Sequence, residues 1–171
     1  QVQGDDMVNP LSSFISATLA ESDRNEVLAA SYYMRALEND PQNLFIAEKA
    51  FFQLVTAGQI VYAAEIAPSL LDTNSIAPLA HLVLATKALK MRDSVTILHH
   101  AAEVKKTSIG YLFAPLMQAW AHAINHDRAA AIDALSELKG NPAIVSIAEA
   151  HKAYILDYMG EIESADSAYK A

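Results

Sequence analysis

The chain of 171 residues contains no cysteine, which excludes disulfide bonds, cysteine-ligated metal sites and thiol catalysis but assigns no compartment. Basic residues are few as well: 12 Lys and Arg stand against 20 Asp and Glu, and a net charge of −8 argues against nucleic acid as a ligand. No apolar run approaches the roughly 20 residues of a membrane-spanning helix. Because 53% of the residues are hydrophobic and only 19% are charged, a disordered chain is also excluded.

Recognisable catalytic signatures are missing too. There is no glycine-rich phosphate loop, no nucleophile elbow and no carboxylate pair in a known setting. His122 and His126 share a helix face, but no glutamate stands between them and His126 falls in an expected turn. The other histidines lack an identifiable ligand partner, namely His81, His99, His100 and His151. We therefore expect no catalytic residue, no bound metal and no cofactor.

What the sequence does contain is an ungapped period of 34 residues. Positions 24, 58, 92, 126 and 160 are spaced by this period. Of the ten sites that lie seven residues before or five residues after one of them, alanine occupies eight. A period of about 34 residues is typical of a helix–turn–helix pair, and antiparallel helices approach to about 8–10 Å where the facing side chains are small. The pattern predicts an all-α solenoid whose turns are centred on Arg24, Gly58, Arg92, His126 and Gly160.

Proline and asparagine predict the helix boundaries. Asn9-Pro10 and Asn141-Pro142 each place an N-cap before a proline at the first helical position. Pro68 falls inside an expected helix from Ile60 to about Leu71 and should kink it or end it early. The other five prolines are expected in first turns or just after helices. The remaining expected helices span about 10–22, 26–38, 44–56, 78–90, 94–105 and 112–124, with three more after residue 127.

The segment with Ala29, Tyr33, Ala36 and Pro41 resembles the second-helix half of the tetratricopeptide repeat (TPR), and Ala165 and Tyr169 repeat that match in part. The three middle blocks keep the period but lose the aromatic residue and the proline, so they resemble degenerate TPRs. The resemblance implies a right-handed α-solenoid of antiparallel helix pairs. Its expected parts are a flexible stub over 1–9 and one solenoid domain of five repeats over 10–43, 44–77, 78–111, 112–145 and 146–171.

In TPR proteins the first helix of each pair lines the concave face. Positions 2, 5 and 9 of each block share one helix face, and the resemblance therefore implies a protein-binding groove. For position 2, sealing of the contact with the preceding repeat is an alternative to binding. For position 9, binding and packing both stay open. The candidate groove residues are Phe45, Phe52, Leu82, Phe113, Leu116, Trp120 and Tyr154.

Chaperone-binding TPRs hold acidic tails with a clamp of basic and amide side chains. The corresponding positions here offer only Lys49, and the net charge of −8 disfavours an acidic tail. The expected function is a non-catalytic scaffold that binds a protein or peptide segment. The alternatives are a self-assembly module and, less favoured, a metal-dependent enzyme.

The polar start at Gln1 is what remains after signal-peptide cleavage, although a cloning boundary looks the same. No polar capping element follows Ala171. These features lead us to expect the N-terminal part of a longer exported bacterial TPR protein, similar to periplasmic adaptors that serve proteases or envelope assembly. The alternative is a complete cytoplasmic scaffold.

Overall fold

The computed structural model describes residues 9–170, and the elements in this range are ten α-helices and one 3₁₀-helix. They form an α-solenoid of helix pairs, as the period predicts. The chain divides into two compact units, one up to Ala80 and one from His81 onward. Of the stub expected over 1–9, only Asn9 lies within the described residues. Among those residues, no helix is long and apolar enough to cross a bilayer.

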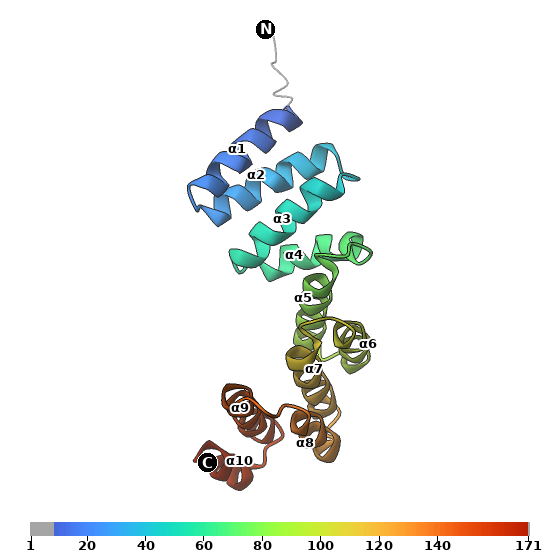
Figure 1. Cartoon of the computed structure of the whole chain (residues 1–171), viewed down its shortest axis with the longest axis vertical. Helices are drawn as coiled ribbons and strands as arrows, with labels where there is room; N and C mark the ends of the chain where they lie inside the picture. Colours follow the sequence, from blue (N-terminus) through green and yellow to red (C-terminus); the bar gives the residue numbers. More distant parts are fainter. Residues whose placement is uncertain (1–8, 171) are drawn as a thin grey trace. The chain divides into compact units, whose positions relative to one another are not determined.

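In the first unit each helix packs antiparallel to the next one (Figure 1). Asparagine side chains cap three of these helices, since Asn9, Asn25 and Asn43 accept hydrogen bonds from first-turn amides. The elements are α1 (Pro10–Ser22), α2 (Glu26–Asn39), α3 (Leu44–Thr56), α4 (Ile60–Ile66) and the 3₁₀-helix η1 (Ala67–Leu70).

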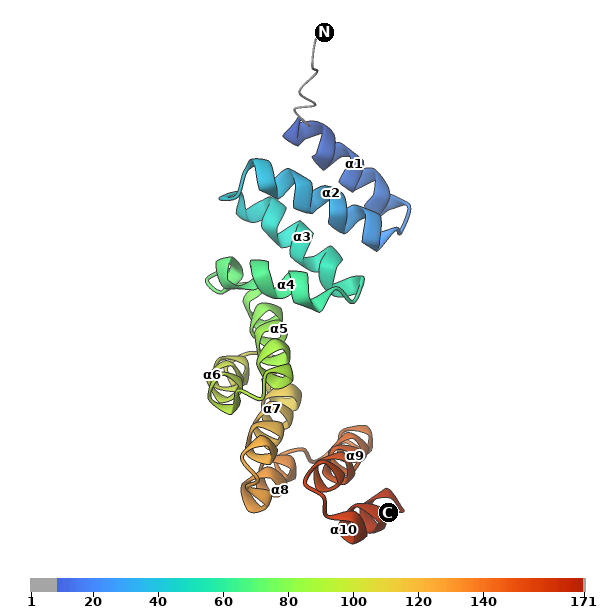
Figure 2. The ribbon, with the colours of Figure 1, turned by 180° about the vertical axis from the view of Figure 1, so that it is seen from behind.

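In the second unit, α7 packs against α6, α8 and α9, and α9 packs against α10 (Figure 2). Asp93, Asp127 and Asn141 supply side-chain caps for α6, α8 and α9. The elements are α5 (Ala77–Lys90), α6 (Ser94–Lys105), α7 (Gly110–Ile124), α8 (Arg128–Ser136), α9 (Pro142–Tyr158) and α10 (Ile162–Tyr169).

The two prolines inside expected helices had different outcomes. The prediction for Pro68 is confirmed: α4 ends at Ile66, and a 3₁₀ turn carries the chain through the proline. The expectation that the other prolines avoid helix interiors was wrong for Pro115. Because α7 begins at Gly110, two residues earlier than predicted, Pro115 lies inside the helix and removes one backbone hydrogen bond.

All five turns inside the helix pairs share one backbone conformation. Each period position has a positive φ, between 55° and 81°, and so lies in the left-handed region. At Arg92, for example, the Arg92 amide donates to the Leu89 carbonyl (3.1 Å) and the Asp93 amide to the Ala88 carbonyl (2.9 Å), which is the Schellman C-cap. The same C-terminal helix cap therefore recurs every 34 residues. Its left-handed residue is glycine in two of the five repeats, at Gly58 and Gly160.

This conformation predicts the outcome of glycine exchanges. Arg24→Gly and His126→Gly should each raise the free energy of unfolding by about 0.5–1 kcal/mol, because glycine adopts positive φ without steric cost. Gly58→Ala should lower it by about 1 kcal/mol. Urea denaturation of the three variants measures both effects. Loss of stability in Arg24→Gly and His126→Gly would contradict the prediction.

The alanine sites on either side of each turn are buried, as close helix approach requires. Ala17, Ala29, Ala63 and Ala119 are completely buried. In the second unit, Ala119, Ala123 and Ala131 join Leu135 and Ile155 in one apolar cluster. These small side chains permit the close approach of the two helices of each pair.

Candidate protein-binding groove

An apolar groove of about 250 Å³ lies between α5 and α7 in the second unit. The groove follows from helical spacing, because residues three or four apart lie on one face of a helix. Four of the seven predicted groove residues come together here: Leu82, Phe113, Leu116 and Trp120. The remaining lining residues are Ala85, Thr86, Leu89, Ile97, Met117 and His151.

The only tryptophan of the chain dominates one end of this groove. The Trp120 indole Nε1 donates a hydrogen bond to Nδ1 of His151 on α9, at 3.0 Å. Burial lowers the pKa of His151, which favours the neutral ring that can accept this bond. Trp120 also packs against the apolar cluster of the second unit. Its polar edge is therefore satisfied within the protein, and the ring offers apolar surface to the groove.

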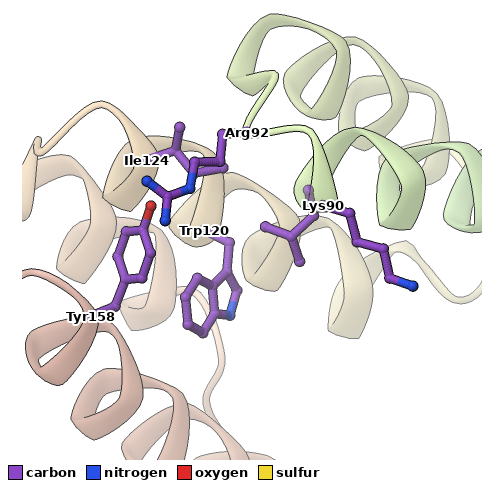
Figure 3. Close-up of a pocket in the computed structure, with 6 residues that line it drawn as sticks. Lys90, Arg92, Trp120, Ile124 and Tyr158 are labelled. Atoms are coloured by element: carbon purple, nitrogen blue, oxygen red, sulfur yellow. The ribbon is translucent and has the colours of Figure 1, made fainter.

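A second hollow of about 200 Å³ adjoins the groove, since Leu89 and Trp120 line both. The Arg92 guanidinium carbon lies 5.7 Å from the centroid of the Tyr158 ring, within the range of a cation–π contact. Tyr158 in turn meets Trp120 edge to face, with the centroids 5.8 Å apart. Figure 3 shows these three side chains together, with Lys90 pointing away from the rings. Ile124 completes the lining.

The other three predicted groove residues lie elsewhere. Phe45 and Phe52 belong to the first unit and are 58% and 49% exposed. The Phe45 ring lies 6.0 Å from the ring of Phe14 on α1, so position 2 of the second repeat also contacts the preceding repeat. Tyr154 is exposed and lines a separate hollow between α9 and α10 with Tyr169. The binding role of all seven residues stays a prediction.

Two histidine contacts were not predicted from the sequence. Nδ1 of His81 lies 2.9 Å from Nδ1 of His100, and His100 is only 7% exposed. The hairpin register contained the information needed to find this pair. Ala85 and Ile97 face each other across the helix pair that the turn at Arg92 joins. One helical turn further from that turn on each helix, His81 lies opposite His100. The Trp120–His151 contact joins neighbouring repeats, and this register does not predict it.

The His81–His100 pair predicts a pH dependence of stability. Burial lowers the pKa of His100 from 6.5 to about 4, so the unfolded chain takes up a proton first as the pH falls. Its contribution to stability is full above about pH 6.5 and is lost between there and about pH 4, and the loss at pH 5.0 is on the order of 2 kcal/mol. Urea midpoints at pH 7.5 and 5.0 test this. His100→Asn should reduce the slope of the profile, and the exposed-turn variant His126→Asn serves as the control.

In the first unit, Lys49 already has a carboxylate partner. Its ammonium forms an ion pair with Glu21 at 3.0 Å, and the Tyr33 hydroxyl donates to the same carboxylate at 2.7 Å. The Tyr33 hydrogen bond is the main cause that lowers the pKa of Glu21, and Lys49 adds to it. The one side chain suited to a carboxylate clamp is therefore engaged within the protein.

His122 and His126 occupy the end of α7 and the following turn, as predicted. Within residues 9–170, no three His, Cys, Asp or Glu side chains are arranged to hold a metal ion.

Comparison with protein-family models and with curated proteins finds no match. Among solved structures, the chain is similar to one titled "Crystal structure of MamA protein", with a TM-score of 0.65 and 14% identity. The match covers 94% of this chain and 88% of the other. At this identity the likeness shows the fold alone, a TPR-like α-solenoid.

Proposed function

We propose that the protein is a non-catalytic scaffold that binds a protein segment in the groove between α5 and α7. The observation that carries this proposal is the apolar lining around Trp120, which is open to solvent and large enough for a few side chains. Tryptophan and other aromatic residues are the usual anchors of protein interfaces. A segment with apolar side chains would remove this surface from water at about 25 cal/mol per Å² of apolar area.

Trp120 supplies the readout for a test, because it is the only tryptophan in the chain. A random heptapeptide display library panned against the protein should enrich apolar peptides, and these peptides should change the Trp120 fluorescence. Phe113→Ala should weaken their binding about tenfold, as truncation of a contact residue does. The matched control is Tyr111→Ala, which changes an exposed aromatic residue of the same helix outside the groove.

The proposal fails if no peptide is enriched, or if the enriched peptides leave the Trp120 fluorescence unchanged. The self-assembly alternative is favoured by the many exposed apolar side chains, among them Leu11, Val95 and Ile162. Light scattering separates the two functions. A dimer that Phe113→Ala converts to a monomer would identify the groove as a self-assembly surface.

A metal-dependent enzyme is the least supported alternative. Three histidines of the second unit, His81, His100 and His151, already contact protein groups. Metal analysis of the purified protein tests this alternative. Stoichiometric metal that disappears in His122→Ala would overturn the scaffold proposal.

More specifically, we propose that the protein is an adaptor in the bacterial cell envelope and that it is located in the periplasm. It rests on the resemblance of the degenerate repeats to exported TPR proteins that serve periplasmic proteases or envelope assembly. Fractionation of cells that express the whole gene from its own start codon tests the location. Recovery in the cytosol alone would contradict it, and the scaffold proposal would stand without the envelope context.

A further inference from the structure

Carboxylates are absent from the two helices that form the groove. The chain has 20 Asp and Glu against 12 Lys and Arg, yet none of these acids lies in α5 or α7. None lines the groove or the adjoining hollow, whereas Lys90 and Arg92 line the hollow. The charged side chains that line the hollow are therefore all cationic, although the protein as a whole is acidic.

Arg92 differs from the lysines of α5, because a role in stabilising the helix end does not account for its positive charge. Lys87 and Lys90 lie in the last turn of α5, where the helix dipole favours positive charge. Arg92 lies beyond the helix, at a left-handed position that Gly58 fills in another repeat, so its backbone is strained.

The Arg92 side chain also lacks a carboxylate partner. Within residues 9–170, Arg92 takes part in none of the ion pairs, whereas Arg128 of the next turn pairs with Glu161 at 2.9 Å. Its guanidinium instead lies over the Tyr158 ring, at the rim of the hollow that Trp120 shares with the groove (Figure 3).

We propose that Arg92 binds an acidic side chain of the segment held in the groove, so that the ligand is a short apolar peptide carrying Asp or Glu. This inference rests on the proposed scaffold function and specifies its partner. The apolar side chains lie against Leu82, Phe113 and Trp120, and the carboxylate lies at the hollow's rim. Guanidinium–carboxylate hydrogen bonds are among the strongest in proteins.

The net charge of the chain does not oppose this arrangement at short range. At physiological ionic strength the Debye length is about 8 Å, so exposed acids beyond that distance are largely screened. The two charged side chains that line the hollow, Lys90 and Arg92, are both cationic. The site also differs from the carboxylate clamp of chaperone-binding TPRs, because Arg92 lies in a turn and not on a first helix.

The experiment is to pan the same heptapeptide display library against the wild type and Arg92→Gly. Displayed peptides have no free C-terminus, so any carboxylate preference comes from Asp or Glu side chains. Arg92→Gly removes the guanidinium and leaves a residue suited to the backbone. Arg24→Gly makes the same change at the equivalent turn of the first unit and serves as the matched control.

We expect the wild type and Arg24→Gly to enrich apolar peptides that contain an acid, and Arg92→Gly to enrich apolar peptides without one. For a selected peptide, changing its acid to the corresponding amide should weaken wild-type binding about tenfold. The same change should have less than about a twofold effect with Arg92→Gly. Fluorescence anisotropy of labelled peptides measures the ratio of the acid and amide affinities for each protein. Addition of 0.5 M NaCl should reduce this ratio for the wild type.

Apolar peptides without acid enrichment on the wild type would overturn this inference and leave the scaffold proposal standing. An acid preference that survives in Arg92→Gly would also overturn it. If the library yields no apolar peptide, the scaffold proposal itself fails. A wild-type dimer that becomes a monomer in Arg92→Gly would assign the hollow to a second copy of the chain instead.

Discussion

Gly110→Ala is expected to lower the free energy of unfolding of the second unit by about 3 kcal/mol, at the upper end of the usual cost of overpacking. Gly110 is the first residue of α7 and lies against the end of α6. A Cβ there would lie 2.7 Å from Lys105 Cα and 2.8 Å from Lys105 C, and it would overlap the Val104 carbonyl oxygen. These atoms are backbone, so they cannot rotate away. Urea denaturation followed by circular dichroism measures the loss.

Gly58→Ala is the control for Gly110→Ala, because a Cβ at Gly58 meets no atom within 4 Å. Its cost of about 1 kcal/mol comes from the positive φ alone. Gly110 has no positive φ, so its larger cost comes from the contact with α6. Equal losses in the two variants would refute the close approach of α7 to α6.

Phe51→Ala is expected to lower the free energy of unfolding of the first unit by about 3–5 kcal/mol, the usual cost of a cavity left by a buried phenylalanine. The Phe51 side chain is completely buried on α3. The equivalent sites in the other repeats hold alanine, so only the second repeat has a large side chain at this site. Thermal and urea unfolding both report the change.

Phe52→Ala is the matched control, because it makes the same chemical change one residue away on a ring that is 49% exposed. We expect a loss of less than about 1 kcal/mol, since much of this ring is already in water. If Phe52→Ala destabilises the protein as much as Phe51→Ala, the assignment of the buried and exposed faces of α3 is wrong.

Local features of the fold were predictable from the sequence. The helix stop at each period position depends on residues adjacent in the chain, and it was located correctly even where Arg24 or His126 replaces glycine. The early end of α4 followed from Pro68. Pro115 was misplaced because α7 begins at Gly110, in a segment without a capping side chain to mark the start.

The candidate site was predictable only in part. Helical spacing placed Leu82 on α5 and Phe113, Leu116 and Trp120 on α7, and the structure joins them in one groove. The same reasoning grouped Tyr154 with them, but that side chain lines a different hollow. Spacing assigns a residue to a face of its own helix and does not say which neighbouring helix covers that face.

The sequence by itself determined the period, the helix pairs and the small residues at their crossings, because each depends on residues within one repeat. The tertiary structure decided which side chains of different repeats meet. The Trp120–His151 bond spans 31 positions, and the Arg92–Tyr158 contact joins the third repeat to the fifth. Such contacts depend on how one repeat packs on the next, which no local pattern encodes. The apolar groove and the adjoining hollow with Arg92 are a product of that packing.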